Sequence, residues 1–197
     1  MNKSVVDRIA GIIRIITIPP IMVAALLILV RSEDAAVFSV PESFFVSLLC
    51  LAVLPVLAYA VWAIVPSLRK KGRDSQRKLA FLFTFAGYLA ALLYGLLRPV
   101  TDSLQLIYNS YYISSAVLFF LNFVCKIKAS GHICSIAGPL ILCLYFIGPW
   151  SVLPCILIMA ASFWASYHTG RHSVNQMLLG MAVPAAAFGA AYVLYLI

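Results

Sequence analysis

The sequence predicts an all-α, polytopic transmembrane helix bundle with six to seven spans. Of its 197 residues, 64% are hydrophobic and 10% are charged, and the mean hydropathy is +1.04. An average soluble domain has about 45–50% apolar and about 25% charged residues. We therefore expect a single integral membrane domain over residues 1–197. The formal charge of +8 indicates contact with anionic membrane lipids rather than with nucleic acid.

Each expected span is an apolar stretch of about 20 residues bounded by charged residues or by Pro and Gly. The seven candidates cover residues 10–30, 43–65, 79–97, 103–125, 132–148, 150–167 and 173–196. The first is interrupted by Pro19-Pro20, but its apolar run is too long for a signal peptide. The fifth and sixth are short and meet at Gly148-Pro149, which predicts a tight helical hairpin.

The basic residues predict the orientation in the membrane. Twelve of the fourteen Lys and Arg residues fall at the N-terminus, in residues 69–78, at 126–128 and at 171. Only Arg31 and Arg98 fall in the alternate loops. By the positive-inside rule, the N-terminus and the first group of loops are cytoplasmic. We expect a multi-pass protein of a prokaryotic plasma membrane with a basic cytoplasmic face.

All three histidines fall on that predicted cytoplasmic face, which is the main functional signal in so apolar a chain. His132 opens the fifth span, and His168 and His172 close the sixth. Because two spans separate these stretches, both return to one side of the membrane. Two imidazoles can divide the roles of nucleophile and general acid.

The residues next to these histidines predict an anion site. A helix that starts near Ser130-Gly131 offers free backbone N–H groups and the positive end of its dipole, and the glycine lets a ligand approach the backbone. Lys128 adds a point charge, and Arg171 can hold two phosphate oxygens. The chemistry that these residues favour is phosphoryl transfer through a phosphohistidine.

A metal-dependent reaction fits the sequence less well. Only Asp7 and Asp74 lie on the predicted cytoplasmic side, whereas a Mg²⁺ site needs several carboxylates. We therefore expect neither a metal nor a cofactor. His168 and His172 stand four residues apart and leave a helical metal pair as an alternative, with His132 as the third ligand.

The two histidine stretches also carry a family resemblance. Lys128-Ala-Ser-Gly-His132 resembles the first block of the phosphatidic acid phosphatase type 2 superfamily, in its variant that begins with Lys. Arg171-His172-Ser-Val-Asn-Gln176-Met-Leu-Leu-Gly180 resembles the His-Thr-x-x-Gln-Val-x-x-Gly form of the second block. The early Ile15-Ile-Thr-Ile-Pro-Pro20 resembles small bacterial members.

The resemblance implies a role for each matching residue. His172 would attack phosphorus, and His132 would protonate the leaving oxygen. The phosphate cradle would consist of Lys128, Ser130 and Gly131. No metal would be needed.

Three positions depart from the family pattern. Ser166 stands where the second block usually has an Arg, and Gln176 stands where many members have the Asp that orients the nucleophile. In the remaining family motif Ala91 replaces a Lys, and its Arg98-Pro99 dipeptide falls on the opposite predicted face. The candidates for the missing guanidinium are Arg171, Arg73 and Arg77.

These observations together predict a membrane lipid phosphatase. Its substrate would be a phospholipid or an isoprenoid (di)phosphate, and the Gln-containing second block resembles members that act on isoprenoid diphosphates. The alternative is a catalytically impaired relative that binds lipid phosphates or acts as an interaction protein. A small transporter is a third hypothesis, which the absence of an evident inverted repeat disfavours. The oligomeric state stays open.

Overall fold

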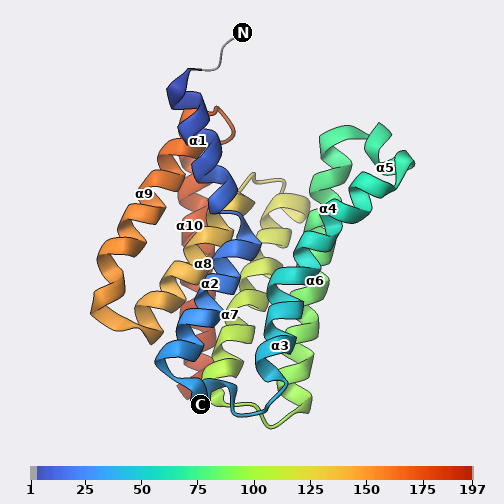
Figure 1. Cartoon of the computed structure of the whole chain (residues 1–197). Coiled ribbons are helices and arrows are strands. Elements are labelled where there is room, and N and C mark those ends of the chain that lie inside the picture. Colours follow the sequence, from blue (N-terminus) through green and yellow to red (C-terminus); the bar gives the residue numbers. More distant parts are fainter. Residues whose placement is uncertain (1–3, 197) are drawn as a thin grey trace.

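The computed structural model describes residues 4–196, apart from the side chain of Arg73, and this part of the chain folds into helices without strands (Figure 1). The helices are α1 (Val5–Ile16), α2 (Pro19–Glu33), α3 (Ser43–Leu48), α4 (Leu54–Ile64), α5 (Pro66–Lys70), α6 (Gly72–Leu97), α7 (Asp102–Phe119), α8 (Gly131–Phe146), α9 (Val152–His168) and α10 (Val174–Leu196). A π-helical turn, Leu49–Val53, joins α3 to α4, and another, Phe120–Val124, extends α7. Short 3-10 turns precede α3 and α9, at Ala35–Phe38 and Gly148–Ser151.

Five stretches are long and apolar enough to cross a bilayer. They are Ser43–Ile64, Asp74–Leu97, Asp102–Val124, Gly148–His168 and Val174–Leu196. A sixth is formed by α1 and α2 together, and α8 is an apolar helix of 16 residues. The predicted all-α, polytopic bundle is confirmed, and the chain has the helices of an integral multi-pass membrane protein.

The first predicted span is not one straight helix, because α1 and α2 meet at an angle of 53°. The break lies just before Pro19 and Pro20, which occupy the first turn of α2 and cannot donate backbone hydrogen bonds to a preceding turn. Thr17 closes α1, where its hydroxyl donates to the carbonyl oxygen of Ile13 at 2.7 Å. The outward face of α1 is apolar and exposed, with Val5 and Ile12 among its residues.

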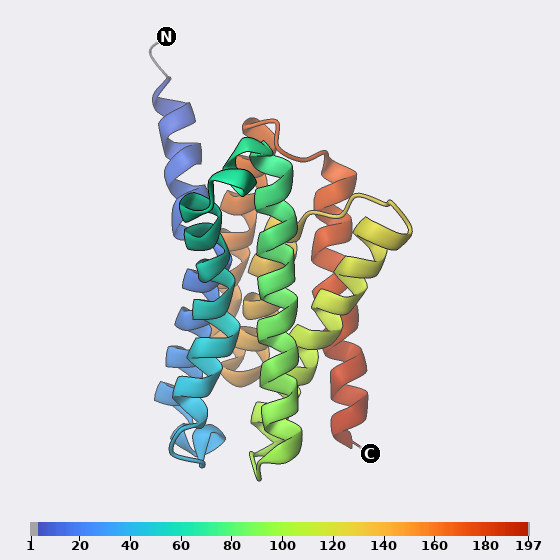
Figure 2. The same ribbon diagram turned by 90° about the vertical axis from the view of Figure 1, so that its right-hand side faces the viewer.

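The two ends of the bundle differ in charge. The N-terminus, α5 and the segments before α8 and α10 lie at one end, and the C-terminus lies at the other (Figures 1 and 2). Of the basic side chains described, all but Arg31 and Arg98 belong to segments at the first end, which we call the basic end. Lys3 and the side chain of Arg73 lie outside the described residues.

Helix packing positions the segments at the basic end. Helix α10 packs against α7 and α8, α2 packs against α8, and α9 packs against α1 and α8. The buried core lies between these helices and includes Leu27, Ile107 and Ile136, each without exposed surface. Figure 2, turned by 90° from Figure 1, shows α10 running the length of the bundle. The starts of α8 and α10 therefore lie next to each other, and α1 lies against the last turns of α9.

Candidate functional site

The start of α8 is fixed against α10 by backbone contacts. The backbone N–H of Ser130 donates to the carbonyl oxygen of Gln176 at 2.8 Å, and the buried Ser130 hydroxyl caps α8 by accepting from the N–H of Ile133 at 3.3 Å. Gly180 makes the approach of α10 possible, because a Cβ at this position would come within 2.5 Å of the carbonyl oxygen of Ser130. His132, two residues after Ser130, is thereby held near the first turn of α10.

His172 lies in the segment between α9 and α10, and its orientation is set by Gln176. The imidazole Nδ1 is 3.3 Å from Oε1 of Gln176. The backbone N–H of Ser173 donates to the same Oε1 at 3.4 Å, so the amide oxygen, and not the amide nitrogen, faces the ring. Nδ1–H is then the donor to Gln176, and the lone pair of the imidazole is on Nε2.

The surroundings of His172 favour its neutral form. Burial lowers the pKa of His172 most, the hydrogen bond to Gln176 raises it, and the positive charges of Arg14 and Arg77 lower it further. The net result is a pKa below the ordinary value of 6.5. The ring therefore has an available lone pair at neutral pH, as a nucleophile requires.

Arg14 of α1 reaches the same region, which the sequence did not predict. Its Nη1 donates to Oγ of Ser166 at 3.3 Å, and Ser166 on α9 has no exposed surface. The charge of Arg14 acts on both His132 and His172. Ser166 is the position where the family resemblance leads us to expect an Arg. In this protein a guanidinium occupies that neighbourhood from a different helix.

A polar cavity of about 180 Å³ opens beside His172. Its other lining residues are Arg77 of α6, Lys128 and Ala129 before α8, Arg171 before α10, and Gln176. Three cationic side chains thus converge from three segments, and none of the lining residues is acidic. A cavity with this charge and size attracts a small anion such as a phosphate group.

His132 lies beside this cavity without lining it. Its Nε2 is buried and has no hydrogen-bond partner among the described residues. Buried polar atoms are nearly always hydrogen-bonded in folded proteins, so an unpartnered one needs a reason. A bound substrate oxygen would supply the partner that Nε2 lacks here.

The predicted site residues separate into two groups. His172, Lys128, Arg171 and Arg77 line the cavity, as expected for residues that contact an anion. Ser130 and Gly131 are not among the lining residues. The Ser130 hydroxyl oxygen accepts in the cap of α8, which leaves its O–H as a donor, and Gly131 is the first residue of α8. Arg73 belongs to α6, but its side chain lies outside the described residues.

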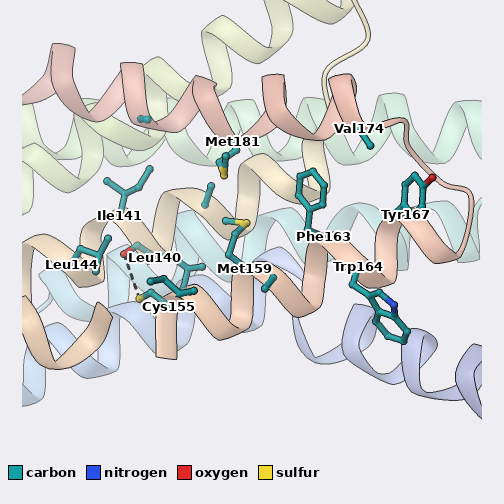
Figure 3. A pocket seen from close by; sticks show the side chains of 14 residues that line it. Leu140, Ile141, Leu144, Cys155, Met159, Phe163, Trp164, Tyr167, Val174 and Met181 are labelled. Atoms are coloured by element: carbon teal, nitrogen blue, oxygen red, sulfur yellow. Dashed lines mark hydrogen bonds between the residues drawn. The ribbon is translucent and has the colours of Figure 1, made fainter. Parts of the chain in front are cut away.

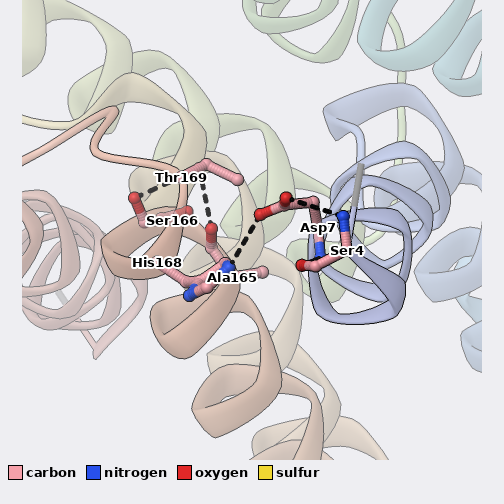
Figure 4. A network of polar contacts seen from close by, with 6 residues as sticks. All are labelled: Ser4, Asp7, Ala165, Ser166, His168 and Thr169. Carbon is pink, nitrogen blue, oxygen red and sulfur yellow. Dashed lines mark hydrogen bonds and ion pairs between the residues drawn. The ribbon is translucent and has the colours of Figure 1, made fainter. Parts of the chain in front are cut away.

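His168 is separated from the cavity by its own contacts. Its Nε2 lies 3.0 Å from Oδ1 of Asp7 on α1 (Figure 4). Its ring stacks on Trp164, with the two centroids 5.5 Å apart. It therefore connects α9 to α1 near the Arg14–Ser166 contact. Among the described residues, no three His, Cys, Asp or Glu side chains are grouped as metal ligands.

Two features between α7 and α8 help to place Lys128. The side chain of Asn122, in the π-helical end of α7, accepts from the N–H of Ala129 at 3.2 Å and donates to the carbonyl oxygen of Leu118 at 3.0 Å. Lys126 adopts a left-handed backbone with φ of 58°, which turns the chain toward α8.

The sequence did hold a signal for Arg14, because a charged residue inside an apolar span usually has a function.

Comparisons with protein-family models, with curated proteins and with solved structures find no match to this chain.

Proposed function

We propose that the protein is a membrane lipid phosphatase that hydrolyses a phospholipid or isoprenoid (di)phosphate through a phosphohistidine. The observation that carries this proposal is the polar cavity at the basic end, where His172 presents a neutral Nε2 among Arg77, Lys128 and Arg171. We further propose that the protein belongs to a prokaryotic plasma membrane, with this end in the cytoplasm as the positive-inside rule predicts. A site at the end of a transmembrane bundle lies at the level of lipid headgroups, which supports a lipid substrate.

In the proposed first step, Nε2 of His172 attacks phosphorus and the bond to the lipid oxygen breaks. Gln176 holds the Nδ1–H, so the lone pair is on Nε2, on the other side of the ring. Arg77, Lys128 and Arg171 neutralise the phosphoryl oxygens, where charge is concentrated during transfer. The products of this step are a phosphorylated His172 and the leaving group, which is a lipid monophosphate from a diphosphate, or a lipid alkoxide that needs one proton to become the alcohol.

His132 supplies that proton in our proposal. Its buried, unpartnered Nε2 lies near Arg14 and His172. Burial and, after it, the charge of Arg14 disfavour a protonated ring. The negative charge of a bound phosphate opposes both effects and favours protonation. In the second step His132 takes a proton from water, the water oxygen attacks phosphorus, and the bond to His172 breaks to release phosphate. Both imidazoles then return to their starting state.

The test is phosphate release by purified protein from a panel of lipid and isoprenoid phosphates, with chelator present. Turnover should persist with chelator and should be inhibited by vanadate, which adopts the geometry of the transition state. His172→Ala should abolish both turnover and a trapped phospho-enzyme. His168→Ala is the matched histidine control and should retain most activity, because its contact is with Asp7. Loss of turnover on chelation, restored by Mg²⁺ or Zn²⁺, would favour a metal mechanism instead.

The role of His132 has its own test. General acid catalysis contributes about 10²–10⁴-fold when the leaving group is a poor one. His132→Ala should therefore slow release of a lipid alkoxide far more than release of a nitrophenolate, which scarcely needs a proton. Equal effects on both leaving groups would remove His132 from this role.

A second candidate function is lipid-phosphate binding without turnover. It is favoured by one observation, the neutral amide of Gln176 beside His172, because a carboxylate there would assist the nucleophile more strongly. In that case a lipid phosphate would bind at the cavity, and mutation of Arg77 or Lys128 would weaken binding, while no phosphate would be released.

A further inference from the structure

A long apolar groove lies between α8, α9 and α10, separate from the polar cavity. Its volume is about 790 Å³. Ile141 and Leu144 of α8, Met159 and Phe163 of α9, and Met181 of α10 line it (Figure 3). The lining is thus aliphatic, aromatic and sulfur-containing.

The groove exists because α9 and α10 do not pack closely together. Helix α9 packs against α1 and α8, whereas α10 packs against α7 and α8, so α8 forms the floor between them. Small side chains on each helix, Ala137, Ala160 and Ala185, leave further space. Ile156 and Tyr167, which also line the groove, are 59% and 63% exposed, so it is open along its side.

One end of the groove lies at the candidate site. Val174 comes two residues after His172, and Tyr167 comes directly after Ser166; both line the groove. The other end is marked by Leu144 and Cys155 (Figure 3). From Cys155 to Tyr167 the chain is helical, and at a rise of about 1.5 Å per residue this stretch is about 18 Å long.

We propose that the groove holds the hydrocarbon chain of the lipid phosphate whose headgroup occupies the polar cavity. This inference rests on the proposed function. Three features support a single chain as the occupant: the apolar lining, the open side toward the membrane, and the end next to His172.

The groove would act mainly by positioning. A chain that moves from the bilayer into the groove gains little transfer free energy, since lipid tails are as apolar as the side chains. Once seated, the chain restricts where its phosphate can lie relative to His172, and such orientation accelerates reactions. For soluble, monomeric substrates the transfer from water adds a direct gain for every methylene buried.

The first experiment measures kcat/KM for a series of monomeric n-alkyl phosphates of increasing length. Each added methylene should raise kcat/KM by about threefold, somewhat less than full burial gives because the groove is open. The gain should stop once the chain is longer than the groove. Ala160→Phe and Ala185→Phe should flatten this dependence and leave the shortest substrate within about twofold of wild type. Ala186→Phe is the control, because Ala186 is the exposed neighbour of Ala185 and does not line the groove.

The second experiment measures binding and does not require turnover. A hexadecyl phosphate with a photoreactive diazirine in mid-chain should label peptides of α9 and α10. Unlabelled hexadecyl phosphate should compete, and Ala185→Phe should reduce labelling several-fold relative to Ala186→Phe. The matching photoreactive alcohol tests whether the phosphate directs the chain to this place.

The outcomes separate the two proposals. If alkyl phosphates are hydrolysed but Ala160→Phe and Ala185→Phe leave the chain-length dependence unchanged, the groove assignment is wrong and the phosphatase proposal stands. If nothing is hydrolysed but competed labelling maps to α9 and α10, the groove assignment stands and the phosphatase proposal fails. Labelling that the phosphate does not compete, equal for the alcohol, means that bulk lipid fills the groove, and it overturns the assignment.

Discussion

Moving the guanidinium of Arg14 to another helix is the most direct test of the site. Arg14 contacts Ser166 at 3.3 Å and acts on both imidazoles. In our proposal the guanidinium of Arg14 takes the place of the Arg that the family resemblance leads us to expect, as a further donor to the transferring phosphoryl group. Arg14→Ala should then lower kcat/KM about 10²–10³-fold, the typical loss for one preorganised donor. Arg8→Ala, on the exposed side of the same helix, removes an equal charge and should have a small effect.

Ser166→Arg alone should be harmful, although it restores the residue that the family resemblance leads us to expect. Ser166 has no exposed surface, and overpacking a buried site costs about 1–3 kcal/mol. Two guanidinium groups about 4 Å apart also repel by on the order of 4 kcal/mol at an effective dielectric constant of 20. The single variant should therefore lose both activity and thermal stability.

The double variant Arg14→Ala with Ser166→Arg should recover activity. It removes the bulk and charge of the original Arg, and it places a guanidinium in the same space from α9. We expect at least a tenfold gain over Arg14→Ala in phosphate release, with Tm measured to show that all variants are folded. A folded double variant no more active than Arg14→Ala, or an Arg14→Ala variant as active as Arg8→Ala, would refute the role given to this guanidinium.

Three further predictions follow from the site and the fold. Gln176→Asp places a carboxylate beside the imidazole Nδ1–H and should raise the pKa of His172. Because activity is lost as the pH falls through that pKa, the acid limb of the pH–rate profile should move to higher pH. An unmoved limb would contradict the hydrogen bond between the two side chains. Gly180→Ala should lower the unfolding free energy by about 1–3 kcal/mol and should lower Tm and activity with it. Gly189→Ala should lower neither, because Gly189 has open space around it. Equal Tm values for the two variants would contradict the close contact between Gly180 and Ser130. In a background without native cysteines, a thiol reagent should label Lys71→Cys only after the cells are permeabilised. It should label Trp150→Cys, at the opposite end of the bundle, in intact cells. The reverse pattern would invert the proposed orientation.

Much of the fold could be predicted from the sequence because hydrophobicity and helix breakers are local signals. The Pro19-Pro20 break, the Gly148 turn and the start of α8 at Ser130 fall within a few residues of their expected places. The gathering of His132 and His172 at one end followed from counting spans. These features depend only on which stretches cross the bundle and in what order.

The contacts between helices could not be predicted in this way. Arg14 and Ser166 are 152 positions apart, and nothing in either segment indicates that α1 packs against α9. The sequence also did not show that the Ser130 hydroxyl caps α8, where it satisfies an N–H that would be costly to leave unpaired at a buried helix start. Gln176 departs from the family pattern, yet its amide oxygen still holds the ring of His172.

The hydrogen bond from Ser130 to Gln176 has a consequence for how the site can open. It joins the starts of α8 and α10 through their backbones, and Gly180 brings the two into contact, so the segments bearing His132 and His172 move as one body. Helix α1, whose outward face is exposed and whose Asp7–His168 contact is partly exposed, has less to lose on local unfolding. Amide hydrogen exchange should therefore be slow at the starts of α8 and α10 and faster in α1, so that α1 is the first element at the basic end to open.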